Sequence, residues 1–139
     1  MLRTLAALAF GLGTVTAAFP QVVQVSACGQ TVPPRGSGVV ITDLTCPSTD
    51  PFVVKVEEKG RLDLAGHTLS GAVRGVQCAG RCIVDSSAGP GTIRDAEVGL
   101  VVIGRLGKPS NLVFENDGIA ILSDFGLTTL RGDQVTITG

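Results

Sequence analysis

Aromatic side chains are scarce in this sequence. It contains no tryptophan and no tyrosine, and aromatic residues make up 4% of its 139 residues. Carbohydrate-binding clefts commonly use aromatic rings as flat apolar surfaces against which a sugar can stack. The composition therefore weakens the case for a glycosidase and for a carbohydrate site built on stacked rings.

Basic runs and histidines are also missing. The formal net charge is −1, and His67 is the single histidine. Removal of an N-terminal leader with Arg3 would leave ten basic and twelve acidic residues. A protein without a polybasic segment is a poor candidate for binding nucleic acid or an anionic membrane surface, so we expect neither partner.

No apolar run is long enough to span a membrane. The longest one, Leu5–Phe19, has about 15 residues, whereas a spanning helix needs about 20. Its single preceding arginine and its small residues Thr16-Ala17-Ala18 are typical of a secretory signal peptide. We expect cleavage after Ala18 or Ala27, so that residues 1–18 or 1–27 are the leader and residues 28–139 form one domain.

A protein with such a leader is exported, so we expect this one to be extracellular or part of the cell envelope. Val25-Ser26-Ala27-Cys28 also fits a lipobox, which would anchor the protein through a lipid on Cys28. The polar residues just before it are unusual for a lipobox and favour the simple leader.

The four cysteines are expected to form disulfides, because an even number in an exported chain usually pairs. Of the three possible connectivities, one would join Cys28 to Cys46 at the N-terminal cap and Cys78 to Cys82 around a short loop. A zinc site at Cys78-x-x-x-Cys82 is the weaker alternative, because its other ligands would have to come from the distant cap.

Short strand-like segments recur along the chain. Residues 68–76 align with residues 92–100 at an offset of 24, with threonine on threonine and glycine on glycine. A third copy begins at Asn111, at an offset of 19, and a fourth begins at Gln134, 23 residues later. Repeats of 20 to 24 residues with β-branched strands and glycine turns are typical of a solenoid.

The segment Leu62–Gly71 resembles the "LDLNGHTI-G" signature of secreted right-handed parallel β-helix repeat proteins of pectin-lyase-like architecture. Ala27–Thr31 and Asp43–Pro47 are similar to the N-terminal lead-in of that group, and Gly91–Asp95 to its next coil. Ala65 departs from the pattern, which normally has asparagine there. The resemblance implies an all-β, single-stranded right-handed parallel β-helix of about four to five coils with a disulfide-tied N-terminal cap.

The end of the sequence predicts an uncovered coil. The fourth copy starts at Gln134, and the sequence stops at Gly139 without an amphipathic cap. Solenoids need polar terminal caps, because an open edge presents unpaired strand groups. We therefore expect a fragment of a longer β-helix, or end-to-end self-association through this coil.

Four acidic residues are the candidates for chemistry. Two of them, Asp95 and Glu97, are expected to alternate along one strand, and the other two, Glu115 and Asp117, along a strand one coil later. The repeat alignment would place all four close together on the solenoid surface. Paired carboxylates could catalyse glycoside hydrolysis or bind calcium beside a polysaccharide. Charged residues also alternate with core residues on any solvated strand, and that interpretation is favoured.

No complete catalytic motif supports an enzyme. The motifs of pectin hydrolases with this architecture are absent, and no residue stands out as the basic catalyst of a pectate lyase. The favoured hypothesis is therefore a structural, surface or polysaccharide-contacting module without a cofactor. The alternative is a fragment of a polysaccharide lyase or glycoside hydrolase, and only the lyase would require calcium.

Overall fold

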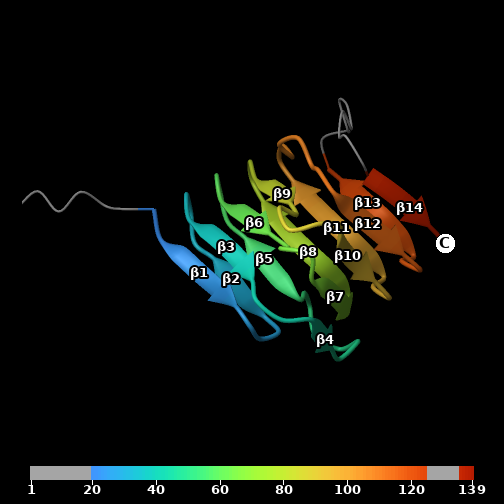
Figure 1. The fold of residues 1–139 in the computed structure, drawn as a ribbon. Helices are drawn as coiled ribbons and strands as arrows, with labels where there is room; N and C mark the ends of the chain where they lie inside the picture. Colours follow the sequence, from blue (N-terminus) through green and yellow to red (C-terminus); the bar gives the residue numbers. More distant parts are fainter. Residues whose placement is uncertain (1–19, 125–134) are drawn as a thin grey trace, which may run out of the picture.

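The computed structural model describes residues 20–124 and 135–139, which form a parallel β-solenoid of about four turns without any helix (Figure 1). This confirms the expected all-β fold. The strands are β1 (Val22–Val25), β2 (Gln30–Val32), β3 (Ser37–Val40), β4 (Leu44–Cys46), β5 (Val54–Val56), β6 (Arg61–Asp63), β7 (Thr68–Gly71), β8 (Arg74–Ala79), β9 (Ile83–Asp85), β10 (Gly91–Arg94), β11 (Val98–Ile103), β12 (Leu112–Glu115), β13 (Ile119–Ser123) and β14 (Val135–Thr138).

The strands stack into three parallel sheets. Sheet A has the order β1-β3-β6-β9, sheet B the order β13-β11-β8-β5-β2, and sheet C the order β14-β12-β10-β7-β4. A complete coil, such as β6 to β8, passes through sheet A, then sheet C, then sheet B. In Figure 1 the coils therefore follow one another along the solenoid from β1 at one end to β14 at the other.

The strand register confirms the repeat offset of 24. Thr92 pairs with Thr68, and Leu100 pairs with Val76. The predicted offset of 19 for the third copy is wrong, because Ile93 pairs with Phe114 and the true offset is 21. A shift of two residues keeps every side chain on the same face of a strand, so the hydrophobic pattern could not reveal the error. The offset of 23 to the fourth copy is correct.

Apolar side chains stack in the interior from coil to coil. Leu44, Leu69, Ile93 and Phe114 are consecutive partners in sheet C, and all four are buried. Leu62 and Leu64 point inward from the repeated turn and are fully buried, as the alternation in Leu62–Gly71 predicts. Each coil covers the apolar face of the next, so the stack supplies a core that no single coil could form.

The turn after β6 requires a left-handed backbone at two successive residues. Gly66 has a φ of 79°, and Ala65 has a φ of 49°. Glycine adopts this region freely and asparagine tolerates it, whereas alanine is strained there. The conformation explains why the repeat pattern normally has asparagine at the position that Ala65 occupies in this chain.

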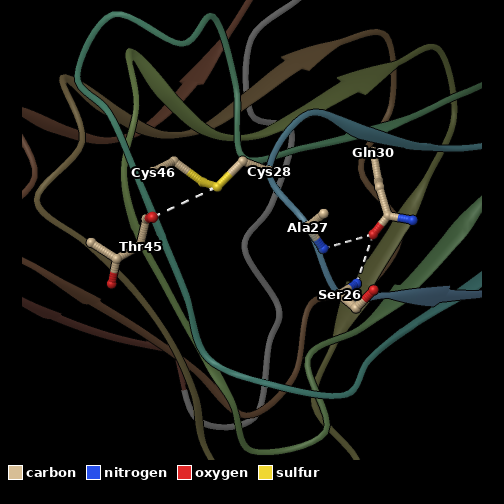
Figure 2. The surroundings of a disulfide bond; sticks show 6 residues. All are labelled: Ser26, Ala27, Cys28, Gln30, Thr45 and Cys46. Atoms are coloured by element: carbon tan, nitrogen blue, oxygen red, sulfur yellow. Dashed lines mark hydrogen bonds between the residues drawn. A yellow bond between two sulfur atoms is a disulfide. The ribbon is translucent and has the colours of Figure 1, made fainter.

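Both expected disulfides are present, and no cysteine is free. Cys28 joins Cys46 beside Thr45, while Gln30 Oε1 accepts hydrogen bonds from the amides of Ser26 and Ala27 and fixes the neighbouring turn (Figure 2). The pairing is consistent with an extracellular location. It also overturns the zinc alternative and the lipid anchor, because the sulfurs that both would use are bonded to each other.

The predicted leader, residues 1–18, lies outside the described residues. Cleavage after Ala27 would remove β1, which belongs to sheet A. Within residues 20–124 and 135–139, no helix is long and apolar enough to cross a membrane.

Strands β13 and β14 are the last strands of sheets B and C in the described part of the chain. They carry exposed apolar side chains, including Ile119 at 47% and Ile137 at 60% exposure. End-to-end association through these edges stays a prediction.

Candidate functional site

The outer face of sheet C carries two rows of polar side chains. One row runs from Asp43 through Thr68 to Thr92, and the other is formed by Thr45, Ser70 and Arg94. Side chains alternate across a strand, so the residues between these positions point into the core and the rows point outward. Because the strands are in register, equivalent hydroxyls recur about 4.8 Å apart along the solenoid.

A shallow groove of about 310 Å³ lies on this face. It crosses strands β4, β7 and β10 and is lined by Asp43, Leu44, Thr45, Thr68, Ser70 and Arg94. Its walls combine hydroxyls, which both donate and accept hydrogen bonds, with one carboxylate and one guanidinium. This chemistry matches ligands that carry many hydroxyl groups.

Asp43 fixes the edge of the groove. Its Oδ1 accepts a hydrogen bond from the Thr68 amide at 2.9 Å and lies 3.1 Å from Nδ1 of His67. These hydrogen bonds, that of Thr68 first, lower the pKa of Asp43 below its ordinary value. His67 thus ties the repeated turn to the preceding coil.

Arg94 is held by its neighbour Asp95. The Arg94 Nε donates to Asp95 Oδ2 at 2.7 Å, and Asn116 Nδ2 donates to Asp95 Oδ1 at 2.8 Å. Ser70 Oγ is a third, longer donor at 3.3 Å. The hydrogen bond from Asn116, followed by that from Arg94, lowers the pKa of Asp95. Asp95 is therefore ionised and engaged in contacts within the protein.

The pKa of Asp117 is raised, whereas that of Asp95 is lowered. Asp117 Oδ1 accepts a hydrogen bond from the Ala96 amide at 2.9 Å, while Oδ2 is buried and has no partner among the described residues. Burial raises the pKa of Asp117 to about 6, and the negative charge of Asp95 adds to the shift. One corner of the solenoid thus holds two carboxyl groups whose environments push their pKa values apart.

The four acidic candidates do gather around this corner, but not as two alternating strand pairs. Asp95 and Glu97 lie in the connection between β10 and β11, and Asp117 lies in the one between β12 and β13. Glu115, at the end of β12, pairs with Arg94. The strand assignment was wrong because the chain turns at Asp95 with a φ of 57°. Whether the four form a functional site stays a prediction.

Other carboxylates cap the corners of the coils. Asp63 Oδ1 accepts hydrogen bonds from the amides of Ala65 and Ser87, and Glu58 Oε2 accepts one from the Arg81 amide. Burial alone would raise the pKa of Asp63, but the hydrogen bonds from Ser87 and Ala65 outweigh it and lower the pKa. These acidic residues satisfy backbone groups that would otherwise lack partners.

One cluster in the described part of the chain has the spacing of metal ligands. It consists of Cys28, Cys46 and Asp50, with ligand atoms within 4.8 Å of one another. The two sulfurs are joined in a disulfide and are therefore not the thiolates that a metal would need.

The groove on sheet C was not predicted from the sequence. Acidic side chains are candidate catalysts and metal ligands by residue type alone, whereas Thr45, Thr68 and Ser70 are residue types that any strand can carry. The repeat alignment did contain a signal, because it placed Thr68 on Thr92. Extending that alignment to Asp43 and Thr45 would have revealed the two rows.

Comparisons with family models, with curated proteins and with solved structures found no match.

Proposed function

We propose that this chain is an exported structural or surface module that contacts polysaccharide through the groove on sheet C. The observation that carries the proposal is the pair of polar rows, with hydroxyls repeated from coil to coil. A polysaccharide is also a repeating, hydroxyl-rich chain, so it can meet the same groups more than once along the solenoid axis.

Such a contact would depend on many weak interactions. A typical hydrogen bond contributes only about 0.5–1.5 kcal/mol net, and the chain has no tryptophan or tyrosine to add ring stacking. We therefore expect modest affinity that grows with the length of the glycan, since longer chains reach more coils. Export is supported by the leader-like N-terminus and by the two disulfides.

The test is binding of the full chain to a panel of long and short polysaccharides, measured by co-sedimentation and calorimetry. Replacing the groove hydroxyls in Thr68→Val/Ser70→Ala should weaken binding about fivefold or more, because each loss removes a hydrogen bond. The matched control, Thr31→Val/Ser48→Ala, removes exposed hydroxyls outside the groove and should bind normally. Equal binding by both variants, or no binding to any glycan, would refute the proposal.

A polysaccharide lyase or hydrolase is the second candidate. It is favoured by the opposite pKa shifts of Asp95 and Asp117, a pattern that acid–base pairs share. Against it, Asp95 is occupied by Arg94 and Asn116, and Asp117 turns one oxygen into the protein. Calcium, if a lyase reaction required it, would need carboxylate oxygens from Glu97, which is exposed, or Glu115, which is half-buried.

Glycan cleavage by the purified chain would support the enzyme and count against a purely binding module. Release of reducing ends should be followed with and without added calcium. If Asp95→Ala and Glu115→Ala leave turnover unchanged, the acidic corner is not the site of the reaction.

A further inference from the structure

The corner that leads from sheet B into sheet A carries one basic residue in each of four successive coils. These residues, which we call the basic column, are Arg35, Lys59, Arg81 and Arg105. They are separated by 24, 22 and 24 residues. The separation matches the coil length, so the solenoid stacks charges that are far apart in the sequence.

Backbone pairing places the column in register. Ser37 pairs with Arg61, and Arg61 pairs with Ile83, which aligns Arg35 with Lys59 and Arg81. A parallel bridge between Cys82 and Leu106 aligns Arg105 with Arg81 in the same way. Hydrogen bonds hold the corner together: the Arg35 amide donates to Glu58 O, and the Cys82 amide donates to Arg105 O, both at 3.0 Å. Neighbouring coils lie about 4.8 Å apart, so the column extends over about 14 Å.

The charges of the column are not neutralised within the described residues. All four side chains are exposed, and none forms an ion pair with an acidic residue of residues 20–124 or 135–139. In the second coil, Glu57 pairs with Lys55 at 2.7 Å, and Glu58 Oε2 accepts a hydrogen bond from the Arg81 amide. Other basic side chains that form ion pairs, such as Arg61 with Asp85, lie outside the column.

Folding does not account for this arrangement. Like charges stacked in successive coils repel each other. A chain with a net charge of −1 and twelve acidic residues could have placed an acidic residue in the column, as it does at other corners. A ligand that carries regularly spaced negative charge would instead turn the repulsion into attraction.

We propose that the basic column binds a linear anionic polysaccharide lying parallel to the solenoid axis. The charged groups of such a glycan follow one another at intervals of one or two sugar rings, which suits cations presented once per coil. The acidic remainder of the chain disfavours nucleic acid, whose binding rests on neutralising the phosphates. The ligand class agrees with the proposed function, but the surface is different and does not depend on the groove of sheet C.

The experiment measures binding of the full chain to heparin, to alginate, to neutral dextran and to a short DNA duplex over a range of salt concentrations. Heparin presents sulfates and alginate presents carboxylates, so the preferred glycan identifies the anionic group. We expect binding to at least one of these two at low salt and a steep loss of affinity as salt rises.

The decisive variant is Arg81→Gln/Arg105→Gln. Neither residue has a positive φ, so glutamine fits the backbone, and circular dichroism with thermal denaturation checks the fold. Its affinity for the anionic glycan should fall about tenfold or more, with a weaker salt dependence. The control Lys55→Gln/Arg74→Gln removes the same charge from the outer face of sheet B and should change affinity by less than about twofold.

Three results would overturn the proposal: equal losses in both variants, tighter binding to DNA than to either glycan, or no binding to an anionic glycan at low salt. The groove variant Thr68→Val/Ser70→Ala separates the two surfaces. If it alone abolishes binding of the anionic glycan, the groove is the site and the column is not. If it leaves that binding intact while Arg81→Gln/Arg105→Gln removes it, the column stands even where the groove proposal fails.

Discussion

At the scale of single residues, Ala65 is a strained position in the repeated turn. Its φ of 49° lies in the left-handed region, and Gly66 follows with a φ of 79°. The amide of Ala65 donates to Asp63 Oδ1 at 2.8 Å, which helps to hold the turn in this conformation. The strain comes from the alanine Cβ, so a residue that tolerates this region should relieve it.

We therefore expect Ala65→Gly and Ala65→Asn to raise the free energy of unfolding by about 0.5–1 kcal/mol. Chemical denaturation measures the change. Ala88→Gly is the control, because Ala88 is an exposed alanine without a positive φ, and glycine there should be neutral or slightly destabilising. A loss of stability in both Ala65 variants would mean that the turn is not strained.

Asp117 should make stability depend on pH. Its pKa in the folded chain is about 6, above the ordinary value of 3.8, so the fold favours the protonated form. The stabilisation is fully present below pH 3.8 and is lost as the pH rises through about 6. Asp43, Asp63 and Asp95 have lowered pKa values, so their contributions are present above pH 3.8 and disappear in acid. We expect maximal stability at mildly acidic pH.

Thermal denaturation between pH 4 and pH 7 tests this expectation with Asp117→Asn. The variant keeps the oxygen that accepts the Ala96 amide but cannot ionise, so the fall in stability toward neutral pH should shrink by about 1 kcal/mol, which allows for the partial exposure of Asp117. Glu97→Gln, an exposed substitution in the equivalent corner, should leave the slope unchanged. An unchanged slope in Asp117→Asn would assign the pH dependence to other groups.

At the scale of strands, the inward stack of sheet C should dominate stability. Ile93 is fully buried between Leu69 and Phe114 in the neighbouring coils. Ile93→Ala removes contacts with both coils and should lower the free energy of unfolding by about 3 kcal/mol. Ile103→Ala, at a side chain that is 40% exposed on β11, should cost less than about 1 kcal/mol. Equal losses would show that the stack is not the main source of stability.

The same stack shows which features of the fold could be predicted from the sequence and which could not. Around Leu69 and Ile93, apolar residues occupy every second position, as expected of a strand with one buried and one solvated face. This pattern predicted which side chains point inward, and its recurrence predicted the offset of 24. The third coil was misaligned because Leu112 and Phe114 are both apolar and both point inward. Two apolar residues on one face look equivalent until the pairing of the strands is known.

The two proposed binding surfaces were harder to predict because each crosses several coils. A search for local basic runs finds none, yet Arg35, Lys59, Arg81 and Arg105 meet at one corner. The hydroxyls of the groove on sheet C are likewise spread over strands β4, β7 and β10. In a solenoid, adjacent surface residues are about one coil apart in the sequence, so the repeat alignment is the appropriate place to look for charge and hydroxyl patterns.

At the scale of the whole molecule, the packing of β1 indicates which of the two expected cleavage sites ends the leader. Val25 is fully buried, and the Ile41 amide donates to Val25 O at 3.1 Å. The whole of β1, Val22–Val25, pairs in parallel with β3. Cleavage after Ala27 would remove this strand and expose the edge of sheet A, whereas cleavage after Ala18 would keep it.

We therefore expect the exported protein to begin at Phe19, a prediction that intact-mass measurement of the secreted product can check. Ala18→Arg should block processing, because signal peptidases require a small residue at the cleavage site, while Ala27→Arg should be processed normally. A mature chain starting at Cys28 would contradict the prediction. It would then mean that the solenoid is stable without β1, and that the Cys28–Cys46 disulfide alone closes this end of the core.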